Sequence, residues 1–151
     1  MQVGADIDGD NAFDESGEAV AISADGNTVA IGARFNDGNG TNSGHARIYN
    51  YDGTNWVQVG ADIDGENAGD QSGFAVAISA DGNTVAIGAP RNDGNGLNSG
   101  HARIYNFDGT NWHQVGADID GENTDDLSGD CLLYTSPSPR DQRGSRMPSS
   151  A

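Results

Sequence analysis

Residues 72–90 read SGFAVAISADGNTVAIGAP, and this stretch decides the fold. Two short runs rich in β-branched residues, 75–80 and 84–89, flank the dipeptide Asp81-Gly82. Asp-Gly between two such runs is typical of a β-hairpin, because a type I′ turn needs positive φ at both central residues. We therefore predict two antiparallel strands joined by this turn.

The whole stretch belongs to a repeat with a period of 56 residues. Residues 2–57 and 58–113 align without gaps, 47 of the 56 positions are identical, and a third copy opens at Gln114. The paired runs of the first copy are therefore 19–24 and 28–33. Self-similarity at a fixed period is typical of solenoids, propellers and arrays.

Each copy continues with a loop rich in Gly and Asn and then a second predicted hairpin. This hairpin joins 45–51 to 56–60 in the first copy and 101–107 to 112–116 in the second. No window shows the 3.6-residue apolar period of a helix. Four antiparallel strands in a repeat of roughly 40–60 residues describe one blade of a β-propeller.

The predicted fold is all-β, with antiparallel four-stranded blades of a β-propeller and about two blades of an incomplete one. Blade 1 is expected at 1–57, with the last strand of a preceding blade at 2–5, and blade 2 at 58–113. Residues 114–130 are expected to start a truncated third repeat. Because closure takes roughly four to eight blades, further blades of the same chain are the expected neighbours.

The last 21 residues, 131–151, differ in composition from the repeats. They hold the only Cys and three of the four Pro, and their back-translation resembles a transposase-type sequencing adapter. The alternative is a Ser/Pro-rich linker. In either case we predict a disordered tail, non-native if it is adapter, and exclude it from fold reasoning.

The composition excludes several classes of function. The formal net charge is −16, and without the tail 4 basic and 22 acidic residues leave −18. Such a surface repels phosphates, so no nucleic-acid partner is expected. No apolar run reaches the roughly 20 residues of a membrane span. The repeats hold no Cys or Lys and no visible activated nucleophile, so an enzyme is not expected either.

The stretch from Ser72 to Pro90 resembles the FG-GAP repeat of integrin α-chain-type propellers. The first copy departs from it, with Arg34 in place of Pro90 and Glu18 in place of Phe74. The "FG" half reads Ser-Gly in both copies, which indicates a divergent branch. The resemblance implies a propeller of about seven blades in an extracellular or cell-surface protein.

Acidic segments precede the first strand of each copy and are the candidate metal sites. Carboxylates at i, i+2 and i+4 beside a Gly resemble a Ca²⁺ loop, although the Gly comes before the third acidic position instead of after it and no bidentate Glu follows. Ca²⁺-binding integrin-type repeats place this loop between the first two strands, where this chain has only Asp-Gly. The alternative is an Asx turn in which Asp14 or Asp70 caps the backbone. The candidate ligands are Asp6, Asp8, Asp10 and Asp14, their copies Asp62, Asp64, Glu66 and Asp70, and the third set Asp118, Asp120, Glu122 and Asp126.

Three further features have both a structural and a ligand-binding interpretation. The loops NDGNGTNSG at 36–44 and NDGNGLNSG at 92–100 are expected to form turns, or a polar Ca²⁺-assisted sugar site. His and Arg at i and i+2 of the third strand are expected to pair with nearby Asp or Glu, or to contact an acidic partner. Trp at the start of the fourth strand is expected to pack on a neighbouring blade, or to stack on a sugar ring. These residues are His45, Arg47 and Trp56, with copies His101, Arg103 and Trp112.

Three functions follow from these observations. The first is a non-catalytic extracellular binding or adhesion module, a fragment of an integrin-α-like FG-GAP propeller with a protein or glycan ligand at the cell surface. The second is a Ca²⁺-dependent, lectin-like propeller, and the third is an accessory domain of a secreted enzyme. No cofactor is expected apart from this possible Ca²⁺.

Overall fold

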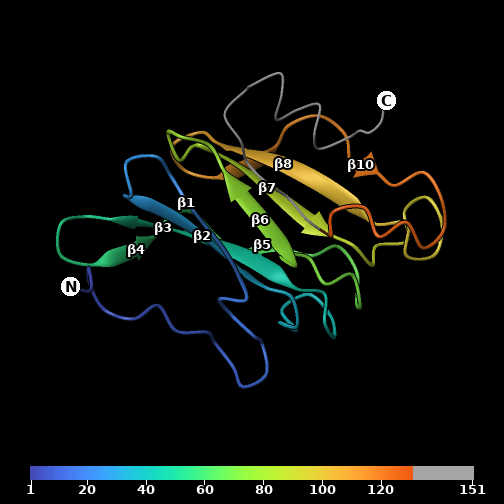
Figure 1. Cartoon of the computed structure of the whole chain (residues 1–151), viewed down its shortest axis with the longest axis horizontal. Coiled ribbons are helices and arrows are strands. Elements are labelled where there is room, and N and C mark those ends of the chain that lie inside the picture. The colour runs from blue at the N-terminus through green and yellow to red at the C-terminus, as the bar shows by residue number, and fades with distance from the viewer. Residues whose placement is uncertain (131–151) are drawn as a thin grey trace.

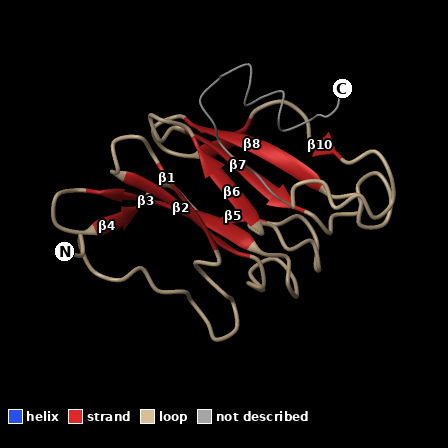
Figure 2. Ribbon diagram, viewed as in Figure 1, coloured by secondary structure: helices blue, strands red, loops and turns tan. Residues whose placement is uncertain are grey.

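The computed structural model describes residues 1–130, and the predicted non-native tail at 131–151 lies outside the described residues. The described part is all-β, with ten strands in two antiparallel sheets and no helix (Figures 1 and 2). It accordingly contains no helix that could cross a membrane. The predicted fold class is confirmed.

Each sheet is a four-stranded meander that one sequence copy builds almost alone. In both meanders, consecutive strands are hydrogen-bonded neighbours, and each of these four strands lies inside its predicted range. The first sheet consists of β1 (Ala19–Ile22), β2 (Thr28–Ala33), β3 (His45–Tyr51) and β4 (Trp56–Gln58). The second consists of β6 (Ala75–Ile78), β7 (Thr84–Ala89), β8 (His101–Phe107) and β9 (Trp112–Gln114).

A fifth, two-residue strand completes the outer edge of each sheet. β5 (Ile63–Asp64) pairs with the first two residues of β3, whereas β4 pairs with the last three. β10 (Ile119–Asp120) does the same on β8. The outermost strand of each blade is thus built in two pieces, the second of which comes from the acidic segment of the next repeat.

Residues 2–5, the predicted last strand of a preceding blade, form no strand in this structure. The described chain offers no preceding sheet with which they could pair.

The turn between β1 and β2 differs from the predicted type I′ turn. Ser23 and Thr28 pair across it (Ser23 N–H to Thr28 O, 2.8 Å), so the loop has four residues. Only Gly26 has positive φ, at 76°. Asp25 Oδ1 accepts a hydrogen bond from the Asn27 N–H at 2.9 Å. The chain thus forms an Asx-type turn here in place of a turn with two residues at positive φ. The hairpin was predicted correctly and its turn type was wrong.

The two sheets pack face to face, with β6 lying on β1 and β2 (Figure 1). The turns also meet, since the Ala24 N–H donates to the Ala80 carbonyl at 3.1 Å. Apolar side chains from both blades fill the space between the sheets. The buried core consists of Ala30, Ala46, Ile48 and Ile63 with Val76, Ile78, Val85 and Ile87.

Identical residues have different environments in the two copies. Val76 and Ile78 of β6 face the first blade and are 6% and 3% exposed. Their copies Val20 and Ile22 in β1 are 63% and 60% exposed. Each blade therefore carries a Val/Ile face that a preceding blade would cover, and the first blade keeps this face open.

Candidate functional site

The acidic segment of the second copy crosses from one blade to the other. Asp62 and Asp64 lie at the first blade, against side chains of β3. Glu66, only two residues further on, turns to the second blade and pairs with Arg103 at 3.0 Å. The structure thus divides the predicted i, i+2, i+4 set between two blades.

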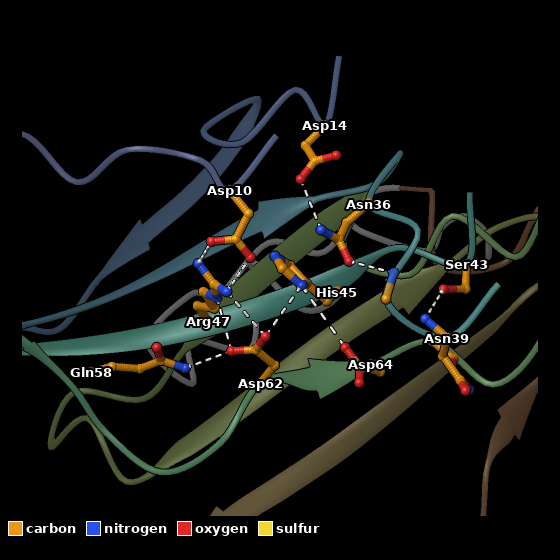
Figure 3. Close-up of polar contacts among 12 residues, drawn as sticks. Asp10, Asp14, Asn36, Asn39, Ser43, His45, Arg47, Gln58, Asp62 and Asp64 are labelled. Atoms are coloured by element: carbon orange, nitrogen blue, oxygen red, sulfur yellow. Dashed lines mark hydrogen bonds and ion pairs between the residues drawn. The ribbon is translucent and has the colours of Figure 1, made fainter. Parts of the chain in front are cut away.

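The carboxylates at the first blade surround a buried histidine (Figure 3). The His45 side chain is 4% exposed, and its Nδ1 lies 3.8 Å from Asp62 Oδ2 and 3.9 Å from Asp64 Oδ1. Among the described residues, this nitrogen has no hydrogen-bond partner. Burial, followed by the charge of Arg47, lowers the pKa of His45. The imidazole is therefore neutral at neutral pH.

Arg47 lies two residues along the same strand face and holds two of the acids. Its Nε donates to Asp62 Oδ1 at 2.8 Å and its Nη2 to Asp62 Oδ2 at 3.1 Å, while its other contacts are with Asp10 of the first copy. This pairing lowers the pKa of Asp62, whereas burial raises the pKa of Asp64. The predicted pairing of Arg with nearby Asp is confirmed. We name the group Asp10, His45, Arg47, Asp62 and Asp64 the first seam cluster.

The second blade repeats this arrangement as the second seam cluster. His101 is again 4% exposed, with Nδ1 unpartnered in the described part of the chain and 3.6 Å from Asp118 Oδ2 and 3.9 Å from Asp120 Oδ1. Arg103 Nε donates to Asp118 at 2.7 Å, which lowers the pKa of Asp118 to about 2. The cluster consists of Glu66, His101, Arg103, Asp118 and Asp120.

The last acid of the first two predicted sets is buried outside the seam clusters, whereas Asp126, the last acid of the third set, is exposed. Asp14 and Asp70 are 5% and 4% exposed, and each accepts a 2.8 Å bond from the side-chain amide of Asn36 or Asn92. Asp70 also accepts a 3.2 Å bond from the backbone N–H of Asn67, so it caps the backbone on its N-terminal side and not, as the capping interpretation expects, near the following Ser-Gly. Burial raises the pKa of Asp70.

Asp6 and Asp8 lie near the N-terminus, and both are exposed. Asp6 accepts a 2.8 Å bond from the Gln2 amide. Their copies Asp62 and Asp64 pair with β3 residues of a preceding blade, and the described chain provides no such strand for Asp6 and Asp8.

The glycine-rich loop after β2 is fixed to the acidic segment of the next repeat. Asn39 Nδ2 donates to the Gly65 carbonyl at 2.8 Å, and backbone N–H groups of 65–72 donate to carbonyls of 41–44 at 2.8–3.0 Å. Inside the loop, Asp37 Oδ1 accepts the Asn42 N–H at 2.8 Å. Residues 90–100 and 121–128 repeat these contacts. We name the combined surface of these loops the loop face.

The tryptophans pack at the same seams. Trp112 Nε1 donates to the Val59 carbonyl of the preceding blade's outer segment at 2.8 Å, and its ring lies 5.0 Å from that of Phe107. Trp56 makes the matching contact with the Val3 carbonyl at 2.9 Å. The predicted packing of Trp112 against a neighbouring blade is confirmed.

Sequence reasoning missed the histidines as partners of the acidic segment. It assigned the acids to a crossover loop and the histidines to a strand, because β5 and β10 were not predicted. The alternation of polar and apolar residues in Ala61-Asp62-Ile63-Asp64 is the signal that could have predicted a strand there.

Comparison with known families gives one result. The family model of the FG-GAP repeat matches the chain twice, over residues 3–49 and 53–105. A search of curated proteins finds no significant match. The two matched regions contain six of the ten strands whole and most of β3 and β8, together with most of the loop face, and they leave out the outer pieces β9 and β10.

Proposed function

The chain belongs to the FG-GAP repeat family, and from this premise we propose that it is a non-catalytic binding or adhesion module of an extracellular protein, similar to part of an integrin α-chain propeller. Repeats of this family build β-propeller-type modules that are typically non-catalytic and commonly extracellular. The acidic, Cys-free and Lys-free repeats fit such surroundings, where salt screens the self-repulsion of the chain. The proposed ligand is a protein or glycan at the cell surface.

The observation that carries this proposal is the internal order of the loop face. Its loops are held by backbone and Asn hydrogen bonds within the chain, in both copies. The exposed side chains between these bonds include Thr41 and Leu97. Loops that are ordered before a ligand arrives lose less entropy on binding, and rigid scaffolds commonly carry their binding residues on such loops.

The sequence differences between the two copies also support the loop face as the binding surface. Of the nine positions that differ, six align with the segments that form the loop face: 10, 13, 15, 34, 35 and 41 of the first copy. The hydrogen-bonding residues Asn36, Asn39 and Ser43 are the same in both copies. The frame of the loops is thus constant while the exposed positions vary, as expected of a surface that adapts to ligands.

A lectin-like function is the second candidate, because a polar and aromatic pocket occurs twice. In the second blade it has a volume of about 240 Å³ and is lined by Tyr105, Asn111 and Trp112 together with residues 61–64. Its counterpart in the first blade has about 220 Å³ and is lined by the equivalent residues. An aromatic ring beside amide and carboxylate groups is a suitable surface for a sugar.

Binding of the immobilised chain to intact cells, matrix proteins and a glycan array, with and without Ca²⁺, tests both candidates. The double variant Thr41→Leu/Leu97→Thr exchanges the exposed loop tips and leaves the frame intact. If the loop face binds the ligand, this exchange changes the affinity without changing the thermal stability. If the pocket binds a sugar, Asn111→Ala abolishes glycan retention instead. Absence of binding to all three probe sets would contradict the proposal.

A further inference from the structure

The two seam clusters have a feature that hydrogen bonding and ion pairing leave unexplained. In each, a histidine Nδ1 is buried, has no hydrogen-bond partner among residues 1–130, and points at two carboxylate oxygens 3.6–3.9 Å away (Figure 3). A neutral Nδ1 without its proton presents a lone pair to negative oxygens. A protonated Nδ1 is too far from them for a hydrogen bond. Either state leaves a buried polar atom unsatisfied, at a cost that proteins seldom tolerate without a partner.

The geometry points to a divalent-metal site on each blade, where the acidic segment of the following repeat pairs with the third strand, with the histidine Nδ1 and the adjacent carboxylates as ligands. The site takes a zinc-class ion in preference to Ca²⁺. This inference is independent of the proposed binding function.

The donor atoms are close enough together to share one ion. In His45, Asp62 and Asp64 of the first cluster, and in Glu66, His101 and Asp118 of the second, one ligand atom from each residue lies within 4.8 Å of the others. A zinc-class ion bonds imidazole nitrogen and carboxylate oxygen at about 2.0–2.2 Å, so atoms at this separation close onto it with small side-chain rotations.

The charge of each cluster also matches a dication. In the first cluster, Asp10, Asp62 and Asp64 contribute −3 and Arg47 contributes +1, while His45 is neutral, which gives −2. The second cluster reaches the same −2 from Glu66, Asp118, Asp120 and Arg103. A bound dication neutralises these charges.

The chemistry of the donors selects the ion. Ca²⁺ takes six to eight oxygen ligands and rarely a nitrogen, whereas imidazole with carboxylate suits zinc-class metals. Arg47 and Gln58 donate to Asp62 and fix its orientation, as outer partners of metal ligands do.

The test is titration of the full chain with Zn²⁺ by isothermal calorimetry after removal of metals with a chelator. The Cys131→Ser background is used, because a thiolate is itself a zinc ligand. We expect two sites per chain. His45→Gln removes one site, His101→Gln removes the other, and the double variant binds none. His113→Gln keeps both sites, since His113 lies outside the clusters and is 61% exposed.

Co²⁺ absorbance gives an independent readout, because bands of nitrogen and oxygen ligation should disappear with the same two variants. If His45→Gln does not fold, Asp64→Asn replaces it, since Asp64 is partly exposed and the hydrogen bonds of Arg47 go to Asp62 and Asp10 instead. We expect at least a tenfold weaker first site in that variant. Undiminished Zn²⁺ binding in the double histidine variant, no Zn²⁺ binding by the parent chain, or equal affinity for Ca²⁺ would overturn the inference.

Discussion

The substitutions Ile22→Ala and Ile78→Ala test the packing of the two blades, because they make the same chemical change at equivalent positions. Ile78 is 3% exposed against the first blade, whereas Ile22 is 60% exposed on the open face. Any difference between the two variants therefore reports the contact between blades and not the propensity of the residue.

The magnitude follows from the carbon atoms removed. Ile→Ala deletes three carbons, each worth about 0.8 kcal/mol when buried, so full burial gives about 2.4 kcal/mol. Nearly all of this applies at Ile78 and about two fifths of it, ~1 kcal/mol, at Ile22. A cavity remains only at Ile78, which brings that variant into the usual 2–5 kcal/mol range. The expected difference in the free energy of unfolding is about 2 kcal/mol.

Urea denaturation followed by tryptophan fluorescence measures this difference. With a dependence on urea of about 2 kcal/mol per molar, Ile78→Ala lowers the midpoint by about 1 M more than Ile22→Ala does. Ile78→Val is the milder companion and costs about 0.5–1.5 kcal/mol if the alanine variant does not fold. Equal midpoints for Ile22→Ala and Ile78→Ala would refute the packing of β6 on the first sheet.

Three further predictions concern single contacts. Backbone N–H groups of Asn111 and Thr110, followed by His113, lower the pKa of Asp108 to about 2. This is below the unfolded value of about 3.9, so the contribution of Asp108 to stability is present above that pH and is lost as the pH falls through about 2. In the first blade the equivalent residues are Asp52 and Val57. An NMR titration should therefore show that His113→Val raises the pKa of Asp108 toward that of Asp52. An unchanged pKa would mean that His113 does not contribute to the shift. Gly32→Ala directs a Cβ into the Gly73 carbonyl and should lower the free energy of unfolding by more than 2 kcal/mol. Gly53→Ala meets no neighbour, so only its positive φ should lower the free energy of unfolding, by about 1 kcal/mol. Equal thermal midpoints of the two variants would argue against the close approach of Gly32 and Gly73. Trp112→Phe removes the bond to the Val59 carbonyl and should cost about 1 kcal/mol in urea denaturation, and a cost no greater than a few tenths would mean that this bond contributes little.

The strands were predictable because their signals are local. The runs at 19–24, 28–33 and 45–51 carry β-branched residues between turn residues. These local patterns are sufficient to predict antiparallel strands joined by turns. The type of the first turn was not predictable from Asp-Gly alone. There, Asp25 bonds the Asn27 N–H and replaces a backbone conformation by a side-chain contact.

The candidate site was predictable only in part, because it joins residues from two repeats. The acidic residues and the His/Arg pair were both visible in the sequence. Their meeting depends on β5, two residues long, which adds to β3 from the following copy. The four-residue alternation at 61–64 is the only sequence signal for a strand this short, and the position of the strand is decided by the packing of Ile63 into the core between the blades. Tertiary packing, and not local preference, thus assembles the seam cluster.

This assembly has a consequence for any longer array of the same repeat. One acidic segment supplies Asp62 and Asp64 to the blade before it and Glu66 to the blade after it, so each seam cluster needs two consecutive copies. Each cluster thus lies on one blade, at the junction of two consecutive copies, and gathers three carboxylates around one arginine. The number of seam clusters should then grow with the number of junctions between copies, and a cation bound there would stabilise the array in proportion to its length. If the free energy of unfolding rose with added repeats but not with added Zn²⁺, apolar packing and not the metal would be the cause of the increase in stability.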